Sequence, residues 1–523
     1  MFETIWQDTR FAVRMLRKSP LFTVTAALSL AIGIGANATI FSVGSAMLLR
    51  PMPGITGSDR LVDIGRHRGG DDFDTASYPN YRDLRDRATS FSGIYAYTLE
   101  PAPMSLRLDS DAQRVYGALV SGNYFETLQV RPEIGRLIGR ADDGTPGSRA
   151  VAVLSHDLWL RRFGSDPQVV GRPVTINGFS FTVLGVAPRG FQGTTVIKAD
   201  VWMPMSMLTS AMPSRQNDLF SSRRATWLFM GGRLRDGVSI AQANAELATL
   251  AAALEREHPE VNARMGFRAH PVAVIPGVRK LVAGFIGLLM AIVSLMLLIA
   301  CVNLAGMLLA RGASRGREMA VRLAIGAGQG RIVRQLLTET AVLFLCGALA
   351  GLALSQGLTR LLLSILPQLP VPLFVDISTD WRVVTFTAVM SLAASVVCGL
   401  APALQARRTS LVPSLKGDTP GGGSSKLRLR NVFVVGQVTL SLVLVIAAGL
   451  FIRALEHAAS TPTGFDHRNV DVVALDLSLA RYDDRTGPAF IDELLERTHA
   501  LPMVRSAAIA VDLPTAATWV SAP

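Results

Sequence analysis

The sequence has few charged and few aromatic residues for its length. Of its 523 residues, 18% are charged and 7% are aromatic, whereas 49% are hydrophobic. Soluble domains carry charged residues at about 25%, and the mean hydropathy of +0.34 indicates that much of the chain lies in lipid. The formal net charge of +12 does not indicate a nucleic-acid partner, because the basic residues gather beside apolar runs and base-stacking aromatics are scarce. We interpret these cations as groups that orient and anchor a membrane protein.

The sequence also has few cysteines and lacks common catalytic motifs. All three cysteines, Cys301, Cys346 and Cys398, lie inside apolar runs, so we interpret them as packing residues and expect neither a disulfide nor a thiolate metal site. The sequence contains neither a P-loop pattern nor HExxH, and the nearest P-loop look-alike, GGGSSKLR from Gly421, is typical of a flexible linker. We therefore expect no ATPase active site, no cofactor and no metal in this chain.

Five stretches lack charged residues for long enough to cross about 30 Å of hydrocarbon as a helix. They are residues 21–49, 281–310, 340–359, 383–406 and 431–452. None contains an Asp, Glu, Lys or Arg, the groups that ion- or proton-coupled transporters use at the bilayer midplane. The sequence therefore predicts five membrane-spanning helices and argues against secondary transport.

The distribution of Lys and Arg around these stretches predicts their orientation. Residues 1–20, 311–334 and 407–430 carry four, six and six basic residues, whereas residues 361–382 carry only Arg382 against two aspartates. Basic residues beside a span resist translocation. We therefore expect the N-terminus and both basic loops to face the cytoplasm, and residues 51–278 and 453–523 to lie outside.

The segment between the first two spans is predicted to fold as a mixed α/β domain. Asn177-Gly178 joins two alternating β-branched and aromatic runs in RPVTINGFSFTVLGVAP, which predicts a hairpin with a type I′ turn. Ser239 and Gln242 form a capping box that opens a helix. The apolar positions of that helix step by three or four residues and predict one face packed on a sheet; they are Ile240, Ala243, Leu247, Leu250 and Leu254.

The end of the chain resembles the start of this domain. VDVVALDLSL predicts a strand, PAFIDELLERTHAL a helix and VRSAAIAVDL a second strand, in the order of LVDIG, YPNYRDLRDRATSF and residues 94–97 after the first span. This order indicates an internal repeat whose second copy is short. We expect the chain to be an incomplete form of a longer duplicated protein or, alternatively, a natural short form.

The segment REMAVRLAIGAGQGRIVRQLLTE, residues 317–339, is the most specific one in the sequence. Glu318 and Arg322 can pair at i, i+4 on a short helix, three glycines then break it, and an amphipathic helix restarts at Ile332. Such a helix lying along the membrane surface has two possible roles. It is either a basic interfacial anchor or a docking element for a cytoplasmic partner.

This segment and residues 8–53, DTRFAVRMLRKSPLFTVTAALSLAIGIGANATIFSVGSAMLLRPMP, together resemble the MacB/FtsX superfamily of ABC transporter permeases. Within it, the sequence is similar to the duplicated orphan permeases of acidobacterial type. The resemblance implies an α-helical membrane protein with five transmembrane helices and a mixed α/β extracytoplasmic domain like the MacB periplasmic core. It also implies a bacterial inner-membrane location.

The resemblance assigns roles to the segments. It implies a cytoplasmic amphipathic segment, a first span, a MacB-like core, an FtsX-like three-span permease domain with a coupling loop, a cytoplasmic linker, a fifth span and an incomplete second core. Their ranges are 1–20, 21–49, 51–278, 280–410 with the loop at 311–335, 411–430, 431–452 and 453–523.

The resemblance also implies how such a permease works. Its coupling loop would sit on a cytoplasmic ABC ATPase subunit, and nucleotide-driven closure would move the outer domain, a mechanism called mechanotransmission. The implied contact residues are Glu318, Met319, Arg322, Leu323, Gly326 and Ala327. A periplasmic adaptor or a second permease copy are further candidate partners. Export or efflux is the expected function; a non-transporting regulator of an outer-surface enzyme or sensor and a membrane scaffold are the alternatives.

The predicted orientation can be tested with single cysteines in a cysteine-free background. An impermeant thiol reagent should label Ser378→Cys in intact cells, and should label Ser424→Cys only after permeabilisation, because residues 407–430 are expected to face the cytoplasm. The reverse pattern would show an inverted protein and would place residues 51–278 inside the cell.

Overall fold

The computed structural model divides into two compact units, which we describe separately. The helical unit comprises residues 1–49, 281–368 and 376–461, and the core unit comprises residues 50–280, 369–375 and 462–523. The structure describes residues 2–50, 52–70, 73–99, 101–108, 111–195, 197–211, 217–314, 329–365, 377, 379–407, 423–460, 470–473, 475, 477, 482 and 485–510.

Five helices of the described residues are long and apolar enough to cross a membrane. They are α2 (Pro20–Leu48), α9 (Arg279–Ser314), α11 (Gln329–Ile365), α12 (Trp381–Arg407) and α14 (Gly423–Ser460). Each contains nearly all of one predicted apolar stretch, so these five helices are confirmed. A shorter helix, α1 (Phe2–Arg17), precedes them.

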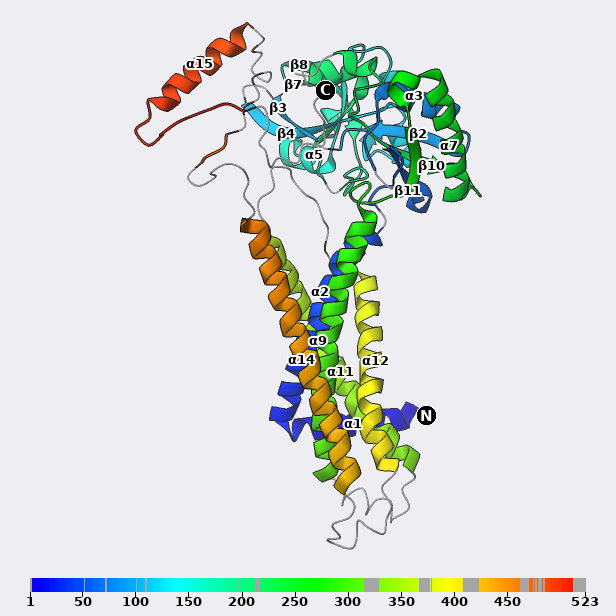
Figure 1. Ribbon diagram of the computed structural model, residues 1–523, viewed down its shortest axis with the longest axis vertical. Coiled ribbons are helices and arrows are strands. Elements are labelled where there is room, and N and C mark those ends of the chain that lie inside the picture. The colour runs from blue at the N-terminus through cyan, green and yellow to red at the C-terminus, as the bar shows by residue number, and fades with distance from the viewer. Residues whose placement is uncertain are drawn as a thin grey trace. The chain divides into compact units, whose positions relative to one another are not determined.

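Helix α2 lies against α11 and α12 in the helical unit (Figure 1). A Cβ atom on Gly351 of α11 would lie 3.1 Å from the backbone nitrogen of Gly35 and 3.2 Å from the carbonyl oxygen of Ala31. The backbones of α2 and α11 are therefore in direct contact, as small residues permit between membrane helices. Toward α9, the side-chain amide of Asn37 donates to the carbonyl oxygen of Val293 at 2.7 Å.

In the core unit, four strands form an antiparallel sheet in the order β11-β1-β10-β2. These are β1 (Leu61–His67), β2 (Phe91–Tyr97), β10 (Phe229–Leu234) and β11 (Gly266–Pro271). Helices α3 (Tyr78–Arg87) and α7 (Ile240–Glu257) connect β1 to β2 and β10 to β11, which is the split βαβ topology. Both helices lie beside one face of the sheet (Figure 1), and their buried side chains belong to the hydrophobic core with those of the sheet. The strand–helix–strand order predicted after the first span is confirmed.

The chain between β2 and β10 forms an inserted second half of the core. Its strands are β3 (Ala102–Leu108), β4 (Asp111–Val120), β5 (Ile134–Gly135), β6 (Val151–Leu154), β7 (Pro173–Ile176), β8 (Phe179–Val186) and β9 (Val201–Pro204). Because β4 pairs with β9 as well as with β3, the strand order β4-β3-β7-β8-β6-β9 returns on itself. Short helices accompany the core: α4 (Tyr124–Leu128), α5 (His156–Phe163), α6 (Leu208–Ala211) and α8 (Pro259–Asn262).

Two local predictions in the core are confirmed. Asn177 and Gly178, with φ of 48° and 80°, form the two-residue turn between β7 and β8, which pair antiparallel. At the start of α7, Ser239 Oγ accepts from the backbone N–H of Gln242 at 3.3 Å, and Gln242 Oε1 accepts from the backbone N–H of Ser239 at 2.8 Å. These turn and cap interactions are local, which is why the sequence predicts them.

Other predictions need correction. Helix α15 (Thr486–His499) is present, but the described residues of 470–477 and 504–510 form no strand. Val472 and Val473 are exposed, and a strand needs a partner to satisfy its backbone. The helix predicted to restart at Ile332 instead begins at Gln329 and continues without a break into the third apolar helix, because neither Gly nor Pro occurs between Arg331 and Cys346.

The α2–α11 contact makes a testable prediction. Gly351→Ile should destabilise the detergent-solubilised protein by about 1–3 kcal/mol, the usual cost of overpacking, because its Cβ would meet backbone atoms of α2. Thermal unfolding followed by size-exclusion chromatography measures the change. The control is Gly357→Ile on the same helix, where a Cβ would meet nothing within 4 Å. Equal stability of the two variants would contradict the close contact.

Candidate coupling site

The predicted contact residues Glu318, Met319, Arg322, Leu323, Gly326 and Ala327 lie outside the described residues. The structure describes the helices on either side of them. Helix α9 ends at Ser314, and helix α11 begins at Gln329. The described part of the site consists of the ends of α9 and α11 and of the N-terminal segment that contacts both.

Helix α1 is held on α11 by an ion pair. Arg334 Nε donates to Asp8 Oδ2 at 2.8 Å, and the side chain of Asp8 is 11% exposed while that of Arg334 is 43% exposed. Asp8, Ala12 and Leu16 are buried at a spacing of four residues, so one face of α1 packs on the protein. The opposite face carries exposed basic residues. Helix α1 is therefore amphipathic in the structure.

The end of α9 is held by the junction between α1 and α2. Arg311 Nη2 donates to Ser19 Oγ at 2.6 Å, and the guanidinium lies 4.7 Å from the ring centroid of Phe22. The hydroxyl of Thr23 donates to the carbonyl oxygen of Leu16 at 2.8 Å and so closes the turn that carries Ser19. The N-terminal segment therefore contacts the helices on both sides of residues 315–328.

The charge pattern of the sequence indicates for Arg311 and Arg334 only a role in setting orientation. The structure gives each a specific partner within the N-terminal segment. A signal was available for one of them, because Asp8 is an acidic residue in a segment that is otherwise rich in Lys and Arg. The pairing itself joins residues 326 positions apart, so sequence spacing could not reveal it.

The described residues offer little for catalysis or for binding a small molecule. No group of three or more His, Cys, Asp or Glu side chains in the described ranges could hold a metal ion. Cys398 Sγ donates to the carbonyl oxygen of Cys301 at 3.5 Å, and both residues are buried, which confirms packing for this pair, whereas Cys346 is exposed.

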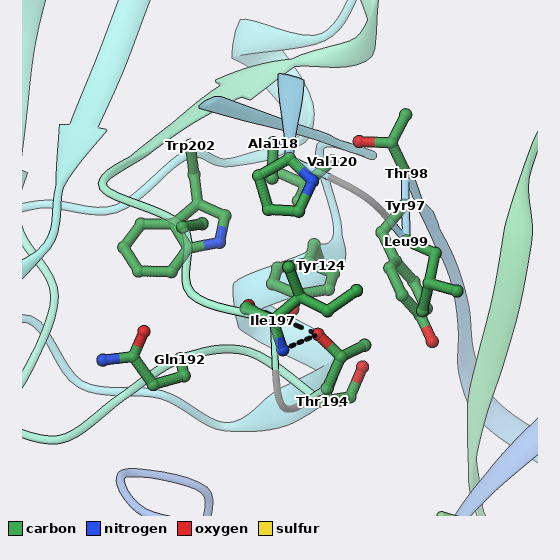
Figure 2. A pocket seen from close by; sticks show the side chains of 13 residues that line it. Tyr97, Thr98, Leu99, Ala118, Val120, Tyr124, Gln192, Thr194, Ile197 and Trp202 are labelled. Carbon is green, nitrogen blue, oxygen red and sulfur yellow. Dashed lines mark hydrogen bonds between the residues drawn. The ribbon is translucent and has the colours of Figure 1, made fainter. Parts of the chain in front are cut away.

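One small pocket lies in the inserted half of the core, between strands β2 and β4 and the loop that precedes β9 (Figure 2). Tyr97, Tyr124, Gln192, Thr194 and Trp202 are among its lining residues. About 10 Å³ is open to the centre of a water molecule, which suffices for about one water. Ligand pockets are of the order of 300–1,000 Å³, so we do not interpret this pocket as a substrate site.

Comparison with known proteins covers both units. Residues 23–250 match the family model of the MacB-like periplasmic core domain, and residues 290–411 match the FtsX-like permease C-terminal model. A macrolide export ATP-binding/permease protein MacB from Burkholderia cenocepacia is 27% identical over 313 residues, which are 58% of this chain and 41% of that protein. A pyoverdine export ATP-binding/permease protein PvdT from Pseudomonas syringae pv. tomato is 26% identical over 285 residues, 54% of this chain and 40% of that one.

A solved structure is also similar to part of the chain. The periplasmic region of MacB from Actinobacillus actinomycetemcomitans covers 42% of this chain and 92% of its own, with 16% identity and a TM-score of 0.31. This chain spans less than half of the length of the MacB and PvdT relatives above.

An α/β core inserted between the first two of five apolar helices fits the class of membrane permeases that carry an extracytoplasmic domain. The two family models match one after the other along the sequence and together cover more than half of it. The chain belongs to the MacB/FtsX-type permeases of ABC transporters.

The contact between α1 and α11 can be tested by charge exchange. Asp8→Arg should raise amide hydrogen exchange in α1 about fivefold, equivalent to about 1 kcal/mol for a half-exposed ion pair, because Asp8 bonds Arg334. Asp8→Arg combined with Arg334→Asp should restore protection. The control is Arg331→Asp, at an exposed position of α11, the helix that carries Arg334. If the double variant exchanges as fast as Asp8→Arg alone, the ion pair does not hold α1.

Proposed function

We propose that this chain couples a separate cytoplasmic ATPase to movement of its core domain, and that this mechanotransmission drives export or efflux. The observation that carries the proposal is that both helices flanking the coupling segment contact the N-terminal segment. Arg311 on α9 and Arg334 on α11 are each fixed to the N-terminal segment. A loop between two fixed helix ends can pass a push from a bound partner into both helices.

The family and the residue pattern support the same proposal. The MacB and PvdT relatives are named as export ATP-binding/permease proteins, whereas the present sequence contains no P-loop. We therefore propose that a separate ATPase subunit hydrolyses the ATP. Within the segment, Glu318, Met319, Arg322, Leu323, Gly326 and Ala327 are the proposed contact residues.

The proposed setting follows from the distribution of charge. Basic residues at 1–20, 311–334 and 407–430 support a cytoplasmic position for these segments in a bacterial inner membrane, with residues 51–278 outside. Assignment to the duplicated orphan permeases belongs to the same proposal. A second permease copy or a periplasmic adaptor would complete the assembly.

The test separates docking from simple anchoring to lipid. Glu318→Lys and Gly326→Trp should each abolish copurification of the ATPase with tagged full-length permease while leaving membrane insertion intact, because docking depends on shape and on particular pairs. An anionic lipid surface attracts cations at about 1 kcal/mol each, so an anchor would tolerate both changes. The bulky control is Gly357→Trp, at an open and exposed position of α11.

Two outcomes would count against docking. Retained copurification with both variants, together with loss of membrane association when Arg331 and Arg334 are neutralised, would favour the interfacial anchor. Copurification that is lost equally in Gly357→Trp would show that any bulky residue disrupts the complex. A third outcome would favour the regulatory alternative. In that case the ATPase copurifies, but ATP changes the activity of an outer-surface enzyme or sensor and drives no export.

A further inference from the structure

We propose that two buried side chains, Arg233 and Asp63, attach two chain segments to the core sheet. Arg233 holds the segment that follows α2, and Asp63 holds the segment that leads to α9. Movement of these two helices therefore reaches the sheet through both side chains. The inference rests on the proposed function and specifies where force enters the core. It uses only contacts within the core unit.

Arg233 of β10 fixes the segment that follows α2. Its side chain is buried, with the residue 2% exposed. Nη1 donates to the carbonyl oxygen of Gly57 and Nη2 to that of Thr56, each at 2.7 Å. Nε donates to Thr127 at 2.7 Å, and Nη2 donates to Leu128 at 3.2 Å, both at backbone carbonyls of α4. One guanidinium therefore joins the incoming segment, the sheet and α4.

This arrangement is unusual for a buried cation. All four hydrogen bonds of Arg233 go to neutral backbone carbonyls, and burying a charge is costly unless its donors are fully satisfied. Gly57 has a φ of +60°, and a Cβ there would lie 3.0 Å from Arg233 Nη1. The glycine thus turns the segment toward the guanidinium without a side chain in between.

Asp63 of β1 fixes the segment that leads to α9. Asp63 is 1% exposed, and its Oδ2 accepts from the backbone N–H of Ala273 at 2.9 Å. Burial raises the pKa of Asp63 to about 8, against the opposing effects of the Ala273 hydrogen bond and of Arg279. Arg279 Nη1 in turn donates to the carbonyl oxygen of Val272 at 3.0 Å. The segment is therefore held at Val272 and Ala273, a few residues before α9.

The two attachment residues lie on the same face of neighbouring strands. In the β1–β10 register Leu61 is opposite Arg233, and Asp63 is opposite Gly231. Side chains two residues apart on a strand share a face. This face is opposite to the one that α3 and α7 cover, since Val62 and Ile64 belong to the core beneath those helices. Both segments are thus fixed to one surface of one sheet.

The test uses full-length permease with the ATPase that copurifies with it, reconstituted in lipid nanodiscs. Hydrogen exchange over β1 and β10 is compared without nucleotide and with ATP plus vanadate. The wild type should show a nucleotide-dependent change. Arg233→Met should lose this change while retaining ATPase binding and hydrolysis, because the helices move but the sheet no longer follows.

Three further variants make the result specific. Asp63→Leu should lose the change, whereas Asp63→Asn should retain it, because an amide oxygen can still accept from Ala273. Arg235→Met is the matched control on the same chain segment, since Arg235 Nε donates to the carbonyl oxygen of Phe91 at 3.2 Å, within the sheet. If Arg233→Met does not fold, a short glycine insertion after Gly277 serves instead, because it lengthens the path from Ala273 to α9 and leaves both attachment residues intact.

The outcomes separate this inference from the proposed function. A wild-type change that persists in Arg233→Met and in the insertion variant would overturn the attachment while leaving ATP coupling in place. No change in the wild-type complex would overturn the proposed function and this inference with it. Loss of the change in Arg235→Met as well would show a general weakening of the sheet and would also overturn the inference.

Discussion

The close approach of α2 to its neighbours is the constraint on which the helical unit depends. Within lipid the backbone of each helix is satisfied internally, so association rests on close packing and a few polar contacts. Gly35 and Gly351 remove the side chains that would separate α2 from α11, and Asn37 bonds the backbone of α9. With α2 fixed in this way, the turn at Ser19 is placed where Arg311 can reach it.

Charged side chains make their contacts only beyond the ends of the apolar stretches. The predicted spans contain no charged residue, and the described ion pair Asp8–Arg334 and the Arg311–Ser19 contact lie at helix ends that flank residues 315–328. These contacts are partly exposed, and such pairs contribute about 0–1 kcal/mol. They can position a loop without fixing it permanently, which suits a segment proposed to respond to a partner.

Features set by neighbouring residues could be predicted from the sequence, and features set by distant pairing could not. The Asn177-Gly178 turn, the Ser239 cap and the five apolar helices each depend on a short stretch of chain. The return of the inserted strands through the β4–β9 pair, the Arg233 contacts and the Asp8–Arg334 ion pair join distant segments. The described residues of VDVVALDLSL form no strand for the same reason, because alternation of residues does not supply a partner strand.

Attachment through buried hydrogen bonds gives the core unit mechanical properties that differ from those of the helical unit. A hydrogen bond to a charged group contributes about 1.5–3 kcal/mol, and Arg233 makes four in parallel to backbone carbonyls. A backbone carbonyl cannot rotate away as a side chain can, so these bonds break only if the segment itself moves. Under a displacement of the helices, the partly exposed Asp8–Arg334 contact should therefore rearrange before the Arg233 attachment does. The core would then respond by moving with its attached segments.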